Sequence, residues 1–213
     1  MSGKWLLLAV TWCATLLAIS AVAQDEKNEL GGTFGHAFIS DQSITGGNFF
    51  NSVVHSGKGW SFDAEYARRF VVTPLFGISG EVLAMYNPDE DLNAGSVTNP
   101  VVPIDYKQLF VTPAARLNLF PTTAISPWVS LGFGLAHFSQ SDRLAFGSTN
   151  PGKSTTSATL EAGVGLDVRL LSRVYLRGEA RDFWSGHPDF PLAPTGRSRQ
   201  HNYYVAAGAY WRF

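Results

Sequence analysis

The sequence contains a single cysteine, and it lies close to the amino terminus. Cys13 sits within a short, mostly apolar segment, Trp5–Ile19, which follows a basic start and precedes an Ala-x-Ala cleavage site at Ala21–Ala23. This arrangement predicts a signal peptide over residues 1–23 and one mature domain over residues 24–213. The mature chain would then have no cysteine, which excludes disulfides, a catalytic thiol and thiolate metal sites.

Long hydrophobic runs and strong net charge are also missing. After the predicted signal peptide, no apolar run reaches the length of a membrane-spanning helix. The formal net charge is −1, so the composition does not favour nucleic acid or another strongly charged partner. Hydrophobic residues nevertheless make up 45% of the chain and aromatic residues 13%, so they must be distributed in some other pattern.

That pattern is alternation with a period of two. In Trp60–Ala67, for example, Trp60, Phe62, Ala64 and Tyr66 alternate with smaller or polar residues. Successive side chains of a β-strand point to opposite faces, so each alternating stretch predicts a strand. Eight such stretches, of which the first is the least regular, lie near residues 30–39, 60–67, 76–86, 108–119, 129–136, 158–169, 174–181 and 203–213.

The connections between these stretches alternate between short and long. The short ones fall near Val71–Leu75, Phe120–Ser126 and Leu171–Arg173, and the long polar ones near Ser40–Ser56, Asn87–Ile104, Gln140–Lys153 and Ser185–His201. Short turns at one end and long loops at the other are typical of an outer-membrane barrel. We therefore predict an all-β fold, an eight-stranded antiparallel up-and-down transmembrane β-barrel with short periplasmic turns and long extracellular loops.

The polar face of the strands carries charges of both signs and almost no lysine. A soluble barrel, the alternative fold, would turn its apolar face inward and would usually carry many lysines and glutamates outside. Small residues and pairable charges suit the interior of a narrow barrel instead. We predict a lumen network of six acidic and five basic residues: Asp63, Glu65, Glu81, Arg116, Glu161, Asp167, Arg169, Arg177, Glu179, Arg181 and Arg212.

Aromatic residues gather near the ends of the strands on the apolar face, as expected for side chains at a membrane–water interface. The predicted aromatic belt and carboxy-terminal assembly signal comprise Trp60, Tyr66, Tyr86, Tyr203, Trp211 and Phe213.

Three segments resemble one known family. They are the aromatic last strand ending in Phe213, PWVSLGFGLAHF at Pro127–Phe138, and LEAGVGLDVRLLSRVYLRGEARDF at Leu160–Phe183. They are similar to the small outer-membrane β-barrel superfamily around the OmpA transmembrane domain and the OmpX type, and the resemblance covers essentially the whole mature chain. It implies recognition of the last strand by the barrel-assembly machinery, and it is poor at specifying function.

One stretch suggests a different chemistry. GSTNPGKS, Gly147–Ser154, matches the pattern of a phosphate-binding loop. Such a loop needs a buried strand before it and a helix after it. Here the preceding residues are polar and the following TTSATLEAGVGLDV alternates like a strand, so we interpret the match as an ordinary external loop.

A second motif resembles the His-x-Ser of outer-membrane lipid A deacylases, in which the histidine activates the serine. In this sequence it is His137-Phe138-Ser139. The Asn-Ala that usually follows is Gln140-Ser141, the position of the family's acid near Thr149–Pro151 holds no acid, and Asp142 is the nearby carboxylate. The alternative reading is an interfacial histidine at a strand end.

The remaining candidate functional residues are charged side chains in the long connections. Asp89, Glu90 and Asp91 make the second loop acidic, and His187, Arg197, Arg199 and His201 make the last one mildly basic. Solvated loops account for both. For Arg197 and Arg199, contact with lipopolysaccharide phosphates is the functional alternative.

Together these features predict a structural or surface-interacting protein of the outer membrane that is not an enzyme and holds no cofactor or metal. The expected partners are outer-membrane lipid and lipopolysaccharide and, during biogenesis, the barrel-assembly machinery; we expect no nucleic acid and a monomer. Two alternatives remain open. One is a narrow channel or carrier for small or apolar solutes, and the other is a deacylase that uses His137 and Ser139.

Overall fold

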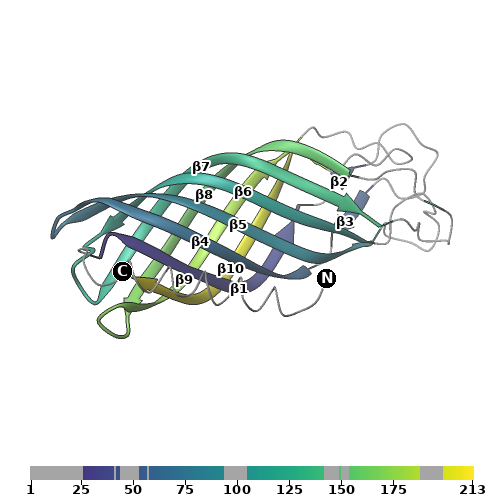
Figure 1. Cartoon of the computed structure of the whole chain (residues 1–213). Helices are drawn as coiled ribbons and strands as arrows, with labels where there is room; N and C mark the ends of the chain where they lie inside the picture. Colours follow the sequence, from purple (N-terminus) through teal and green to yellow (C-terminus); the bar gives the residue numbers. More distant parts are fainter. Residues whose placement is uncertain are drawn as a thin grey trace, which may run out of the picture.

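The computed structural model describes residues 26–40, 42–43, 53–56, 58–93, 105–141, 149, 154–187 and 199–213. Within them, eight long antiparallel strands form a closed barrel (Figure 1). These are β1 (Asn28–Ile39), β4 (Lys58–Val72), β5 (Phe76–Asn93), β6 (Asp105–Leu119), β7 (Ile125–Gln140), β8 (Ser154–Arg169), β9 (Val174–Ser185) and β10 (Gln200–Arg212). The predicted signal peptide, residues 1–23, lies outside the described residues.

Each long strand pairs with its neighbours in the chain, and β1 closes the ring. Phe34 of β1 pairs with Phe62 of β4 on one side and with Ala207 of β10 on the other. Closure leaves no long strand with an unpaired edge, so all eight have ladder partners on both sides. Two short strands, β2 (Gln42–Ser43) and β3 (Val53–Ser56), belong to the connection after β1, and β3 pairs with the last residues of β5.

The two ends of the barrel differ, as Figure 1 shows. At one end, here called the turn end, the strands are joined by the short segments 73–75, 120–124 and 170–173. Both chain ends of the barrel meet there, since the backbone N–H groups of Asn28 and Phe213 each donate to the other residue's carbonyl at 2.9 Å. The opposite end carries the long connections and is called the loop end. The predicted eight-stranded barrel with alternating connections is confirmed.

One predicted boundary was wrong. The acidic residues Asp89–Asp91 were expected in a loop, but β5 continues to Asn93 and Glu90 pairs with Tyr106 of β6. The β5–β6 hairpin remains paired past an irregularity between Asn87 and Glu90, because ladder hydrogen bonds do not depend on side-chain polarity. Strand β8 begins at Ser154, so a strand rather than a helix follows the GSTNPGKS motif, most of which lies outside the described residues.

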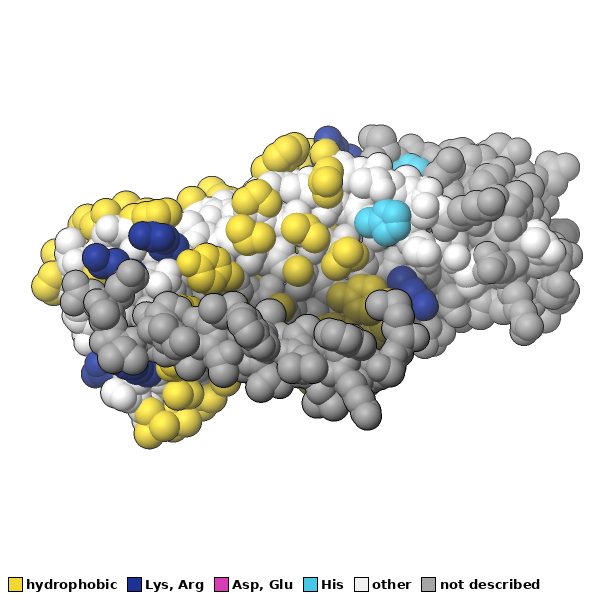
Figure 2. Space-filling view, viewed as in Figure 1, with side chains coloured by type: hydrophobic (Ala, Val, Ile, Leu, Met, Phe, Trp, Pro, Cys, Tyr) yellow, Lys and Arg dark blue, Asp and Glu magenta, His cyan; other side chains and the backbone are white. Residues whose placement is uncertain are grey.

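The apolar face of the strands is on the outside of the barrel. Leu131 and Phe133 are 71% and 59% exposed, whereas Glu65 and Arg177 on the opposite face are each 1% exposed. Figure 2 shows hydrophobic side chains spread over the visible wall of the barrel. In the described part of the chain, no helix is both long and apolar enough to cross a membrane.

Candidate functional site: the filled lumen

Alternation brings charged side chains from seven strands together inside the turn-end half and the middle of the barrel. Buried acidic side chains come from β1, β4, β5, β8 and β9, and buried arginines from β6, β9 and β10. Within the described residues the group comprises Glu29, Asp63, Glu65, Glu81, Arg116, Glu161, Asp167, Arg177, Glu179, Arg181 and Arg212, and we call it the lumen network.

Arg177 of β9 lies at the centre of the part of this network that is nearer the turn end. Its guanidinium donates to both oxygens of Asp167 at 2.7 and 3.0 Å, to Glu65 at 2.9 Å and to Glu29 at 2.6 Å. Its guanidinium carbon also lies 3.8 Å from the ring centre of Tyr210, which adds a cation–π contact. Bidentate pairing of this kind fixes the orientation of both groups.

Glu29 accepts hydrogen bonds from three arginines. Arg116 and Arg177 each donate to Oε1 at 2.6 Å, and Arg212 donates to Oε2 at 2.6 Å. Glu29 was not among the predicted lumen residues, because the predicted first strand begins at Leu30. Extending the alternation backward from Ala37 through Thr33 would have placed Glu29 on the inner face.

Arg181 organises the middle of the barrel. It donates to Glu65 at 2.8 Å, to Glu81 at 3.0 Å and to Glu179 at 3.1 Å, and it pairs with Glu161. Ser130 and Thr112 donate to the two oxygens of Glu161 at 3.0 and 3.2 Å. These buried carboxylates therefore have both ionic and neutral partners, as burial requires.

Asp63 occupies a different environment from the other acids. Thr33 of β1 donates its backbone N–H to Asp63 Oδ1 at 2.9 Å and its hydroxyl lies 2.6 Å from Asp63 Oδ2. The same hydroxyl lies 3.1 Å from Glu179 Oε1 and 2.9 Å from the Tyr204 hydroxyl. Thr33 thus links Asp63 to the network through hydrogen bonds.

The prediction for Arg169 was wrong. Its parity is that of the inward residues of β8, yet it is exposed while Asp167 is 1% exposed. Arg169 is the last residue of β8, where the interior opens to water and parity no longer decides burial. With Glu29 added and Arg169 removed, the described lumen holds seven carboxylates and four guanidiniums, not the nearly balanced set that we expected.

Aromatic rings seal the network toward the turn end. Trp128 is 2% exposed and donates its indole N–H to Asp167 at 3.1 Å. The guanidinium carbons of Arg181 and Arg177 lie 5.0 and 5.1 Å from its ring centre. Tyr175 packs in the same way 3.6 Å from Arg212.

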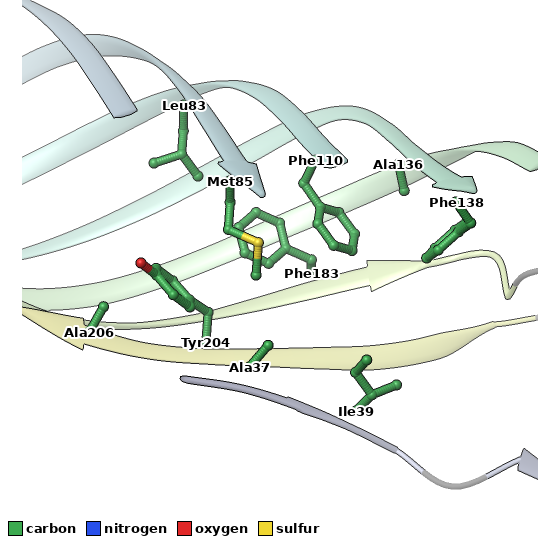
Figure 3. Packing of buried hydrophobic residues seen from close by; sticks show 10 residues of the cluster. All are labelled: Ala37, Ile39, Leu83, Met85, Phe110, Ala136, Phe138, Phe183, Tyr204 and Ala206. Atoms are coloured by element: carbon green, nitrogen blue, oxygen red, sulfur yellow. The ribbon is translucent and has the colours of Figure 1, made fainter. Parts of the chain in front are cut away.

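The loop-end half of the lumen has a different lining. Ten buried residues from β1, β5, β6, β7, β9 and β10 form one hydrophobic cluster, called the apolar layer: Ala37, Ile39, Leu83, Met85, Phe110, Ala136, Phe138, Phe183, Tyr204 and Ala206. Figure 3 shows their side chains pointing toward one another from opposite walls. Phe110 stacks on Phe183 with ring centres 4.6 Å apart and meets Phe138 edge-on at 6.0 Å.

The apolar layer was not predicted. The signal was present, because Phe110, Phe138 and Phe183 all have inward parity. On the loop-end side of the apolar layer, buried amide side chains close the lumen. Asn202 accepts a hydrogen bond from Gln200 at 2.9 Å and donates one to the Phe183 carbonyl at 2.8 Å.

The side chains of the predicted aromatic belt differ in exposure. Trp60, Tyr66 and Tyr203 are 58%, 43% and 46% exposed on the outer face. Tyr86 and Trp211 are partly exposed on that face. Phe213 is only 7% exposed, and its ring stacks on Trp211 with ring centres 4.8 Å apart.

The candidate catalytic pair lies near the loop end of β7. His137 faces outward near the loop end, and its Nδ1 lies 2.8 Å from the Thr156 hydroxyl of β8. In a triad, Nδ1 would face an acid. Asp142, the carboxylate closest in sequence, lies outside the described residues. Among the described residues, no group of three or more His, Cys, Asp or Glu side chains could hold a metal ion.

A closed barrel with an apolar outer face and ion pairs inside is the architecture of an integral outer-membrane protein. The chain belongs to the outer membrane protein β-barrel domain family, whose model matches residues 9–213. The protein therefore resides in the outer membrane, with the turn end toward the periplasm and the loop end toward the exterior. No curated protein sequence matches the chain.

Solved structures share the fold. OprG of Pseudomonas aeruginosa superposes with a TM-score of 0.58 at 13% identity, over 88% of this chain and 96% of that one. Neisserial surface protein A gives 0.53 at 14% identity, over 87% and 97%. AlkL gives 0.51 at 12% identity, over 90% and 92%. At these identities the likeness establishes the fold alone.

Proposed function

We propose that the protein is a structural or surface-interacting outer-membrane barrel that is closed to solutes and presents its loop end for binding. The observation that carries this proposal is the filling of the lumen in both halves. Side chains of the lumen network are almost completely buried, and the apolar layer and the buried amides lie above them. An eight-stranded barrel is wide enough for its own side chains to fill and too narrow for a water channel beside them.

Conductance across planar bilayers tests this proposal. We expect no stepwise conductance from the refolded protein, and none after Arg177→Ala or Glu161→Gln in variants that still migrate as folded barrels. Defined conductance steps that change in size with Arg177→Ala would contradict the proposal and support the channel alternative.

A second candidate function is the carriage of small apolar solutes, which the apolar layer favours. A gap in the pairing of β6 with β7 also favours the carriage of apolar solutes. The β6–β7 ladder lacks the pairs between Val111–Leu135 and Ala114–Gly132, since Pro113 has no N–H to donate. A shallow, open depression of the outer wall, lined by Pro113, Leu131 and Phe133, lies there. Uptake of an apolar solute into cells that express the protein, reduced by Phe110→Ala, would establish this function; uptake equal to that of cells without the protein would eliminate it.

The remaining predictions also stay proposals. We propose that the barrel-assembly machinery recognises the last strand, and that the folded protein is a monomer surrounded by lipid and lipopolysaccharide. We propose no enzymatic activity. Mass spectra of lipid A from cells that express the protein would show a missing acyl chain, dependent on Ser139, if the deacylase alternative were correct.

A further inference from the structure

Basic side chains gather on one side of the turn-end rim. Lys27 precedes β1, Arg69 lies near the end of β4, Arg169 ends β8 and Arg173 precedes β9. Around the ring these strands follow in the order β4, β1, β10, β9 and β8, so the four cations share one sector, here called the basic rim. The turns from β4 to β5 and from β6 to β7 contain no charged residue. Figure 2 shows Lys and Arg side chains at the turn end of the visible face.

The positions of the basic rim continue the inward-facing rows of their strands. Each cation lies two residues beyond a buried residue of such a row, and these buried residues are Glu29, Ala67, Asp167 and Tyr175. Alternation therefore places the four cations around the mouth of the barrel and not among the lipid-facing side chains. Arg68 is different: it is exposed, but its parity is outward, toward lipid.

Little negative charge balances the basic rim. Glu26 Oε1 lies 3.8 Å from Arg173 Nε, and both side chains are open to water. For Lys27 and Arg169, the described part of the chain provides no carboxylate within 4 Å. The lumen-network acids of β1 and β8 are already paired with buried arginines. The mouth therefore presents net positive charge toward the periplasm.

Backbone hydrogen bonds fix the spacing of the basic rim. The N–H of Arg69 donates to the Lys27 carbonyl at 2.7 Å, and the N–H of Arg212 donates to the Arg173 carbonyl at 2.9 Å. The Arg69 guanidinium also donates to the Glu26 carbonyl at 3.2 Å. Four strand spacings separate β4 from β8, which is about 19 Å along the rim. A ligand that meets all four cations must carry several negative charges over this length.

We propose that the basic rim binds an acidic, extended peptide segment of a periplasmic protein. Guanidinium groups pair with side-chain carboxylates through two parallel hydrogen bonds. An extended peptide presents alternate side chains on one face about 7 Å apart, so three or four acidic residues span the rim. Phospholipid headgroups surround the barrel and therefore reach Arg68 rather than the mouth. This surface lies opposite the loop end, so the inference does not rest on the proposed function.

Fluorescence anisotropy tests the inference, with a labelled peptide of alternating Glu and Gly titrated with the folded protein in nonionic detergent. Lys27→Gln and Arg169→Gln should each weaken binding about threefold, as expected for partly exposed ion pairs, and the double variant about tenfold. Glu26→Gln removes the competing acid and should tighten binding about twofold. Added salt should weaken binding. The faster migration of unboiled protein on a gel would verify that each variant is folded.

Arg68→Gln is the matched control, since it removes the same charge next to Arg69 but on the lipid-facing side. We expect it to bind the peptide like the unchanged protein. Equal weakening by Arg68→Gln and Arg169→Gln would overturn the inference, because attraction would then depend on net charge and not on the mouth. Native mass spectrometry with phosphatidylglycerol is the second test. If the Lys27→Gln, Arg169→Gln double variant lost this lipid, headgroups would occupy the basic rim and the inference would also be wrong.

Discussion

In the turn-end half of the lumen, Glu29 and Arg177 are fully buried and joined by charge-assisted hydrogen bonds; in the loop-end half, Phe110 and Phe183 stack without any polar contact between their rings. Both halves fill a cylinder of the same eight strands. They differ in how they tolerate change, because an ion-pair network depends on every partner, whereas an apolar layer depends mainly on volume.

The largest expected effect comes from breaking the network at an acid that has three arginine partners. Glu29→Gln removes a buried carboxylate to which Arg116, Arg177 and Arg212 all donate. We expect a loss of about 3–5 kcal/mol in the free energy of unfolding. Urea titration of the refolded protein in lipid vesicles would measure it.

Glu26→Gln is the control for that change. Glu26 lies 3.8 Å from Arg173, with exposed fractions of 38% and 45% for the two side chains. Exposed pairs contribute about 0–1 kcal/mol, so this variant should unfold almost like the unchanged protein. Equal losses for Glu26→Gln and Glu29→Gln would show that burial of the network does not matter.

A smaller effect is expected in the apolar layer. Phe110→Ala removes a ring that contacts both Phe138 and Phe183, and the cavity should cost about 3 kcal/mol. Phe110→Leu should recover most of this loss, since it restores volume without polarity. If Phe110→Leu unfolded as easily as Phe110→Ala, the apolar half would tolerate substitution no better than the charged half. The proposed difference between the two halves would then be wrong.

The smallest expected effect on stability tests whether Arg169 lies outside the lumen network. Arg169→Gln alters an exposed side chain at the turn-end rim, so we expect a change of about 0.5 kcal/mol or less. Arg177→Gln, at a buried position of the same predicted set, should be strongly destabilising. Comparable losses in the two variants would place Arg169 back in the network.

The sequence was sufficient for the barrel and for most of the network, because a period of two assigns each residue to a face. Ten of the eleven predicted lumen charges are buried as expected. The errors fall at strand ends. Arg169 and Glu29 both lie there, where alternation gives no sign of whether the next residue is still enclosed.

What the sequence by itself determined is therefore which side of each strand a residue occupies. Only the tertiary structure decided which residues meet, since Arg177 contacts Glu65 through barrel closure across 112 positions in the chain. The division of the lumen into a charged and an apolar half likewise depends on strand register. Register sets the height of each side chain in the barrel, and hydrogen bonding between paired strands fixes it.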